Sequence, residues 1–199
     1  MSAIGPLLAA VGGYLLGSVP SSDLAARLAG AGDVDLRRAG SGNPGALNAA
    51  AVLGARVGTV VLAADMAKGA AAGMLGRSIA GPTGAYAAAT AAIAGHILPI
   101  WSRGRGGKGV ATSAGACAAV FPAYFPIDAG VAALAAIARR DPEAAVRISS
   151  AVWVAAALAW WRWRLPNAWG PPPNVGLPAF ALAGAAMILV KFRVARPPR

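Results

Sequence analysis

The sequence predicts an all-α protein, a bundle that crosses a membrane with about seven helices. Hydrophobic residues make up 57% of the 199 residues and charged residues 13%, about half the charged share of a soluble domain. The mean hydropathy of +0.59 agrees with a lipid-embedded chain. The apolar segments lack the period-2 alternation of a β-barrel, and 26 glycines let helices pack closely. We expect one membrane domain over residues 1–199.

The first apolar segment covers residues 3–19 and is closed by a proline. The chain before it lacks the positive charge of a cleaved signal peptide, so we expect this segment to be retained as the first span. The polar segment 21–56 follows. Within it, Leu24, Ala25 and Leu28 recur at helical spacing, which predicts an amphipathic helix on the membrane surface.

Later apolar segments predict the other spans. The segment 110–138 is too long for one helix and carries two prolines, so we expect two short helices joined by the turn F-P-A-Y-F-P-I-D. A polar link over residues 139–147 separates it from the next span, and tryptophans gather beyond that span as in an interfacial aromatic belt. The remaining predicted spans are 57–75, 83–100, 148–161 and 177–190.

The positive charges predict how the chain lies in the membrane. A net charge of +11 is typical of nucleic-acid binding, but the cations flank apolar segments instead of lining one polar face, so we expect no nucleic acid. With seven spans, most of the 18 lysines and arginines fall on one side, including Arg140, Arg196 and Arg199. The positive-inside rule then places the N-terminus outside and the C-terminus in the cytoplasm.

The first of two glycine-rich segments is R-A-G-S-G-N-P-G-A-L-N, residues 38–48. Its glycines permit unusual backbone angles, and a hydroxyl and two side-chain amides lie beside Arg38. Such a loop can turn backbone N–H groups toward an anion. The alternative interpretation is a tight loop that caps the next helix.

The second glycine-rich segment is S-R-G-R-G-G-K-G-V-A-T, residues 102–112. It combines Arg105 and Lys108 with a backbone that can approach a ligand closely, and it opens a helix whose N-terminus favours an anion. The spacing is not that of a Walker A loop, because Gly109 follows Lys108. The alternative is a short cytoplasmic loop whose cations only set the topology.

Few other residues suggest chemistry. His96, the single histidine, can act as a base, a proton carrier or a hydrogen-bond donor to a phosphate, but it can also be a hydrogen-bonded structural residue. Asp65 and Lys68 share one helical face, either as an internal ion pair or with Lys68 as a ligand group. The lone Cys117 lies in an apolar run, and we expect neither a disulfide nor a metal site.

Several linked motifs make the sequence resemble the PlsY-type glycerol-3-phosphate acyltransferases. In order they are G-S-V-P (17–20), D-L-R-R-A-G-S-G-N-P-G-A-L-N (35–48), D-M-A-K-G (65–69), G-H-I-L-P (95–99), G-G-K-G-V-A-T (106–112) and R-I-S-S (147–150). The resemblance implies a bacterial cytoplasmic membrane enzyme that moves a fatty acyl group from acyl phosphate to glycerol 3-phosphate and makes lysophosphatidate. It implies no cofactor, an active site facing the cytoplasm, and leaves association with other phospholipid-synthesis enzymes open.

The resemblance also implies roles for particular residues. The residues expected to act in catalysis are Ser41, Asn48, His96 and Lys108. Those expected to bind substrate are Arg38, Gly42, Asn43, Gly45, Lys68, Arg105, Gly106, Gly107, Gly109, Thr112, Arg147 and Ser150. The acyl chain is expected in an apolar groove between helices.

The chain departs from the family pattern at Leu47, Ala51, Gly104 and Arg105, where the family has threonine, arginine, phenylalanine and lysine. Its end, K-F-R-V-A-R-P-P-R, also lacks the family's C-terminal motif. Two other functions therefore stay open. One is a degenerate relative that binds a phosphate-bearing substrate or a partner enzyme without turnover, and the other is a small anion transporter.

Overall fold

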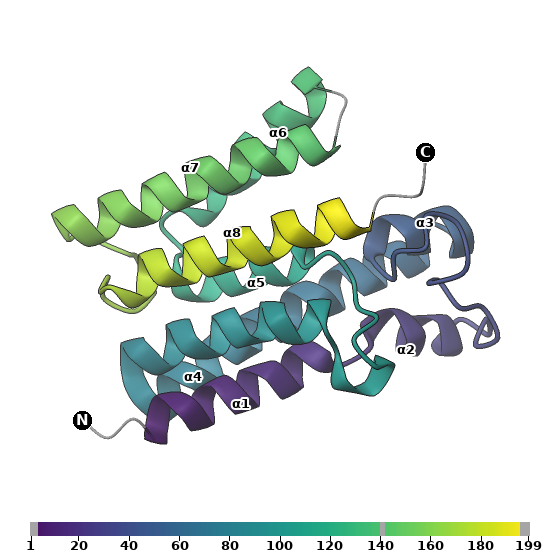
Figure 1. Cartoon of the computed structure of the whole chain (residues 1–199), viewed down its shortest axis with the longest axis horizontal. Helices are drawn as coiled ribbons and strands as arrows, with labels where there is room; N and C mark the ends of the chain where they lie inside the picture. The colour runs from purple at the N-terminus through teal and green to yellow at the C-terminus, as the bar shows by residue number, and fades with distance from the viewer. Residues whose placement is uncertain (1–3, 140–141, 196–199) are drawn as a thin grey trace.

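The structure, a computed structural model, describes residues 4–139 and 142–195 and contains only helices and loops in that part of the chain (Figure 1). A 3₁₀ turn over Ile100–Ser102 precedes the second glycine-rich loop. The helices are α1 (Ile4–Ser18), α2 (Ser21–Leu28), α3 (Ala46–Leu53), α4 (Ala55–Ile97), α5 (Val110–Val120), α6 (Phe125–Arg139), α7 (Pro142–Trp163) and α8 (Gly176–Val194).

The helices are those of a membrane protein. Four helical stretches of the described residues are long and apolar enough to cross a bilayer, and two shorter apolar helices accompany them. The prediction of an all-α membrane bundle is therefore confirmed. The long stretches are Ile4–Leu28, Ala55–Ser102, Glu143–Trp163 and Gly176–Val194, and the short ones are Val110–Val120 and Phe125–Leu134.

Helix α4 consists of two segments that fold back on each other. The break lies at Ala80 and Gly81, whose backbone angles are not helical, directly before Pro82. Proline lacks an N–H group and disfavours the helical conformation of the residue before it, which explains the break. A side chain at Gly76 would collide with the carbonyl of Gly84, so the two segments touch backbone to backbone. They correspond to the predicted spans 57–75 and 83–100.

Glycines hold the central helices together. Helix α1 lies on the second segment of α4, where side chains at Gly13 and Gly17 would collide with Ala88 and Ala92. The first segment of α4 lies equally close to α5, because Gly69 faces the carbonyl of Thr112. Such contacts are typical of membrane helices that associate through small residues. They bring the middle of α4 and its C-terminal end next to the start of α5.

One helix and several helix boundaries differ from those the sequence predicted. Helix α3 was not predicted, although its sequence A-L-N-A-A-A-V-L is a good helix former. Helix α7 begins at Pro142 and not at residue 148, because a 2.9 Å ion pair between Glu143 and Arg147 supports an additional helical turn. The last helix also continues to Val194, beyond the predicted end at residue 190.

The glycine-rich loops gather at one end of the bundle. Figure 1 shows α2, α3 and the loop before α5 at this end, whereas the start of α1, the bend of α4 and the α7–α8 loop lie at the opposite end. The described residues do not include residues 1–3, Arg140, Arg196 and Arg199. The predicted first span began at residue 3, and the predicted orientation used the three arginines. The loop end therefore holds both segments in which we expected the function.

Candidate active site

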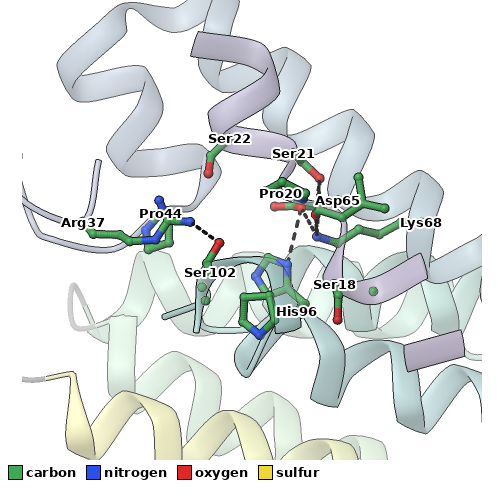
Figure 2. Close-up of a pocket in the computed structure, with 15 residues that line it drawn as sticks. Ser18, Pro20, Ser21, Ser22, Arg37, Pro44, Asp65, Lys68, His96 and Ser102 are labelled. Carbon is green, nitrogen blue, oxygen red and sulfur yellow. Dashed lines mark hydrogen bonds and ion pairs between the residues drawn. The ribbon is translucent and has the colours of Figure 1, made fainter. Parts of the chain in front are cut away.

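A small cavity lies at the loop end of the bundle, where the chain between α1 and α2 meets both glycine-rich loops. Its volume is about 20 Å³, room for about one water molecule. Figure 2 shows Arg37 and Ser102 on one side of it and the side chains of Asp65, Lys68 and His96 on the other. The lining residues are Gly17, Ser18, Val19, Pro20, Ser21, Ser22, Arg37, Pro44, Asp65, Lys68, His96, Pro99, Ser102, Gly106 and Gly107.

Three buried side chains from α4 form a charged cluster on the cavity wall. Asp65 Oδ1 lies 2.8 Å from Lys68 Nζ and 3.4 Å from His96 Nδ1. Asp65, Lys68 and His96 are only 2%, 8% and 7% exposed. Lys68 also donates to the carbonyl of Val19 at 3.1 Å and to the hydroxyl of Ser21 at 3.4 Å. The ammonium therefore ties α4 to the start of α2, and its charge is balanced within the protein.

Arg37 joins the two glycine-rich loops. Its guanidinium donates to Asp23 at 2.8 and 3.1 Å, and Nη1 lies 3.3 Å from Asp35. Nε donates to the carbonyl of Arg105 at 2.8 Å, and Nη2 donates to the hydroxyl of Ser102 at 3.0 Å. One side chain thus connects α2, the first loop and the second loop.

The charges around Arg37 shift the pKa values of two groups. Burial opposes the charge of Arg37, but the hydrogen bonds and negative charges of Asp23 and Asp35 outweigh it and raise its pKa above the usual value. The backbone N–H of Arg37, followed by its guanidinium, holds the pKa of Asp35 below the usual value. The ion pair is therefore charged at neutral pH.

Gly106 and Gly107 lie directly on His96. A side chain at Gly106 would collide with the His96 carbonyl, and one at Gly107 would collide with His96 Nε2. The N–H of Gly106 donates to the carbonyl of Ile97 at 3.2 Å, which holds the loop against the end of α4. The glycines are thus required because the loop passes within contact distance of the imidazole.

Asn48 shapes the first loop. Its Oδ1 accepts from the backbone N–H of Ser41 at 2.8 Å, and its Nδ2 donates to the carbonyls of Leu36 and Ala39 at 3.0 Å each. Asn48 is 4% exposed, and its amide hydrogens and oxygen are engaged with its own loop. The geometry favours a positioning role for this side chain.

Lys108 turns away from the cavity. Its Nζ lies 4.1 Å from the centre of the Phe192 ring on α8, a cation–π contact. Burial lowers the pKa of Lys108, and the negative charge of Glu143 partly opposes that shift. The residue after it, Gly109, has a φ of 87° at the start of α5, a left-handed conformation that favours glycine.

A second, larger cavity lies among α5, α6, α7 and α8. Its volume is about 230 Å³, and most of its walls are apolar. Ser113, Asp128, Ser149 and Ser150 supply its polar groups. Met66 of α4 lines this cavity while the preceding Asp65 lines the small one, so the two cavities are neighbours across α4.

The comparison with known proteins decides the family. The family model described as "Glycerol-3-phosphate acyltransferase" matches residues 7–196. The chain belongs to this family. The resemblance inferred from the motifs is thereby confirmed.

Individual relatives agree with the family. The chain is 47% identical over 109 residues to the glycerol-3-phosphate acyltransferase of Synechococcus sp. (strain JA-3-3Ab), covering 55% of this chain and 53% of the relative. It is 44% identical over 123 residues to that of Rubrobacter xylanophilus, covering 61% and 59%. The aligned part thus spans little more than half the length of these curated relatives.

A solved structure shares the fold over nearly the whole chain. The crystal structure of PlsY (YgiH), an integral membrane glycerol 3-phosphate acyltransferase, in its glycerol 3-phosphate form is 28% identical, with a TM-score of 0.77. The match covers 95% of this chain and 88% of that one. The lysophosphatidic acid form of the same protein matches with a TM-score of 0.76.

The structure brings only some of the predicted site residues of this family member to the small cavity. Lys68, His96, Gly106 and Gly107 line it, and Arg105 contributes its carbonyl to Arg37. Ser150 lines the second cavity instead, and Arg147 is exposed and paired with Glu143. The other predicted residues line neither cavity: Arg38, Ser41, Gly42, Asn43, Gly45, Asn48, Lys108, Gly109 and Thr112.

Sequence reasoning missed several cavity residues. Arg37 was overlooked beside Arg38, and Ser21, Ser22 and Ser102 were assigned no role. One signal was present for the serines, since S-S-D directly follows the G-S-V-P motif and opens a helix, where hydroxyls and free N–H groups favour anions. Within the described residues, no group of three His, Cys, Asp or Glu side chains is placed to hold a metal ion.

Proposed function

We propose that this chain transfers a fatty acyl group from acyl phosphate to the 1-hydroxyl of glycerol 3-phosphate, which yields lysophosphatidate for phospholipid synthesis. The observation that carries this proposal is the cavity at which Arg37, the start of α2, the Asp65–Lys68–His96 cluster and the second glycine-rich loop meet. The solved relative in complex with glycerol 3-phosphate supports the choice of substrate. Both substrates carry phosphate, which suits a site built from fixed cations and backbone N–H groups.

We place this site at the cytoplasmic face of a bacterial cytoplasmic membrane. We assign seven membrane passes to the two segments of α4 together with α1, α5, α6, α7 and α8. With the N-terminus outside, the positive-inside rule then puts the loop end of the bundle in the cytoplasm. This orientation gives the site access to glycerol 3-phosphate in water and to acyl phosphate in the bilayer.

The proposed mechanism uses His96 as the base. Asp65 Oδ1 lies 3.4 Å from His96 Nδ1 on one side of the ring, so the mechanism assigns the proton to Nε2 on the other side. The substrate hydroxyl gives its proton to Nε2 while its oxygen bonds to the acyl carbonyl carbon. The bond from that carbon to the phosphate oxygen then breaks, and inorganic phosphate leaves. Asp65 acts as the residue that orients the imidazole.

Substrate phosphate is held by groups on both sides of the small cavity. Arg37 supplies a fixed cation, and Ser21 and Ser22 supply hydroxyls at the N-terminus of α2. Because the cavity holds about one water molecule, the two loops must separate before glycerol 3-phosphate enters. Lys108 must turn from Phe192 in order to reach the phosphate. The acyl chain occupies the neighbouring cavity of about 230 Å³.

The test uses the full chain, purified and returned to phospholipid vesicles. Labelled glycerol 3-phosphate and acyl phosphate are supplied, and labelled lysophosphatidate is measured against a Lys108→Ala variant. We expect product from the native chain well above that of the variant. Binding of labelled glycerol 3-phosphate without product would favour the degenerate relative, and phosphate flux into the vesicles would favour the transporter.

A further inference from the structure

A third hollow lies at the end of the bundle opposite to the candidate active site. It is a groove of about 500 Å³ between the first segment of α4 and α5, within the size range of ligand pockets. Most of the residues that line it are apolar and have small side chains. Ala70, Gly73 and Met74 lie on one side and Ala119 on the other. Arg77 lies one turn beyond Met74 and one turn before the bend of α4 at Ala80.

We propose that this groove binds one anionic phospholipid, with the phosphate on Arg77 and an acyl chain along the apolar wall. The proposal does not depend on acyl transfer, because the groove and the candidate active site have no lining residue in common. The bend of α4, near Arg77, lies at the end of the bundle opposite to the glycine-rich loops (Figure 1). It assigns a lipid site to a part of the chain that the proposed mechanism does not use.

The guanidinium of Arg77 has N–H donors beyond the one that bonds to Trp169. Nη1 donates to the carbonyl of Trp169 at 2.7 Å, whereas an arginine side chain carries five N–H donors. Arg77 is exposed, and within residues 4–139 and 142–195 no ion pair includes it. A phosphate ester can accept two parallel hydrogen bonds from such a group. The hydrogen bond to Trp169 therefore orients the Arg77 guanidinium, but no carboxylate of the described residues neutralises its charge.

Trp169 fixes the loop that closes the groove. Its Nε1 donates to the carbonyl of Ala118 at 3.2 Å, and 71% of the residue is exposed. An indole with its polar edge bonded and its ring exposed is typical of the headgroup level of a bilayer. Arg77 and the ring thus lie at the depth of lipid phosphates.

The groove combines one cation with an apolar surface, which favours a phospholipid over a free phosphate ion. Inorganic phosphate matches Arg77 but leaves the apolar surface of Met74 and Ala119 unfilled. A phospholipid satisfies both the charge and the apolar wall. An anionic headgroup is favoured over a zwitterionic one, because Arg162 and Arg164 at the end of α7 add positive charge to the same end of the bundle.

The test is native mass spectrometry of the full chain in neutral detergent, titrated with phosphatidylglycerol or with phosphatidylcholine of the same chains. We expect the native chain to retain one phosphatidylglycerol in preference to phosphatidylcholine. Arg77→Gln should retain it about tenfold less, because it loses a charged hydrogen-bond donor, while Arg77→Lys should keep most of the retention. Equal retention by the Arg77→Gln variant overturns the proposal.

Two further variants test whether lipid binding depends on this groove or only on the positive charge at this end of the bundle. Competition with inorganic phosphate tests whether the site prefers a lipid. Arg162→Gln removes a cation at the same end that does not line the groove, so retention should fall far less than in the Arg77→Gln variant, and an equal fall would contradict a site on Arg77. Ala70→Phe fills the apolar wall while leaving Arg77 in place, and retention should fall. Displacement of the lipid by millimolar inorganic phosphate, or unchanged retention in the Ala70→Phe variant, would contradict a lipid site. Melting temperatures in neutral detergent confirm that each variant is folded.

Discussion

The Nε group of Arg37 donates a 2.8 Å hydrogen bond to the backbone carbonyl of Arg105, which connects two loops 68 positions apart in the chain. The same guanidinium is held by Asp23 and Asp35, so its position is fixed from three segments. Because both loops line the small cavity, this contact sets the distance between its walls. Arg37 is therefore the residue on which the shape of the candidate site depends most.

Replacing Arg37 by methionine should weaken both the fold and substrate binding. The change removes charge-assisted hydrogen bonds from a side chain that is 16% exposed, and we expect the free energy of unfolding to fall by about 2 kcal/mol. The KM for glycerol 3-phosphate should rise, because the cavity loses the cation proposed to hold the substrate phosphate. Arg56→Met, at an exposed site on the start of α4, is the matched control and should change stability by less than about 0.5 kcal/mol. Similar results for both variants would show that Arg37 does not organise the loops.

Replacing Lys68 by methionine should destabilise the protein strongly. Asp65 would remain buried beside His96 without its 2.8 Å partner, and breaking such a pair costs about 3–5 kcal/mol. The double variant Asp65→Asn with Lys68→Met should recover much of that stability. Because the double variant also lacks Asp65, which is proposed to orient His96, only retained activity in this variant reports on the role of Lys68. A stable double variant with native turnover would mean that the pair is structural only.

Replacing Gly107 by alanine should reduce acyl transfer by about 100-fold, since the new methyl group would meet His96 Nε2 and displace the proposed base. Gly130→Ala is the control for adding a methyl group. Gly130 lies in α6 with nothing within 4 Å of the added carbon, so activity should not fall. Initial rates with both variants, in the same vesicles, check this prediction. A fully active Gly107→Ala variant would remove His96 Nε2 from the mechanism.

Lys108 should make activity and stability respond to alkaline pH in opposite directions. Burial lowers its pKa in the folded protein below the usual value of about 10.4, so it loses its charge earlier than an exposed lysine as pH rises. Activity should decline in that range, because the proposed phosphate ligand becomes neutral. In the window between the folded and unfolded pKa values the unfolded chain binds more protons, so the contribution of Lys108 to stability increases with pH. Lys108→Arg should keep its charge and remove the alkaline decline that Lys108 causes.

Much of the fold could be predicted because apolar runs and prolines report directly on membrane helices. The break of α4 at Pro82 and the break of 110–138 into two helices both follow from local chemistry. Helix α3 was missed because Ala46–Leu53 lies within residues 21–56, which were treated as one polar segment with a single amphipathic helix. The start of α7 was missed since its first turns are polar.

The candidate site could be predicted only in part. The motifs pointed to the two loops that meet at the small cavity and to Lys68 and His96, which line it. They did not show that Asp65 contacts both of those side chains or that Lys108 rests on Phe192, because these contacts depend on how helices pack. Arg37 and Arg38 are adjacent and chemically equal, and only the tertiary structure distinguishes them.

The most direct test of the account is the initial rate of lysophosphatidate formation by purified native protein and by a His96→Gln variant, with both substrates saturating. Glutamine keeps a polar contact with Asp65 but cannot act as a base. We predict that the variant still binds labelled glycerol 3-phosphate while its rate falls by about 100-fold or more. A variant rate within about twofold of the native rate would contradict the proposed site.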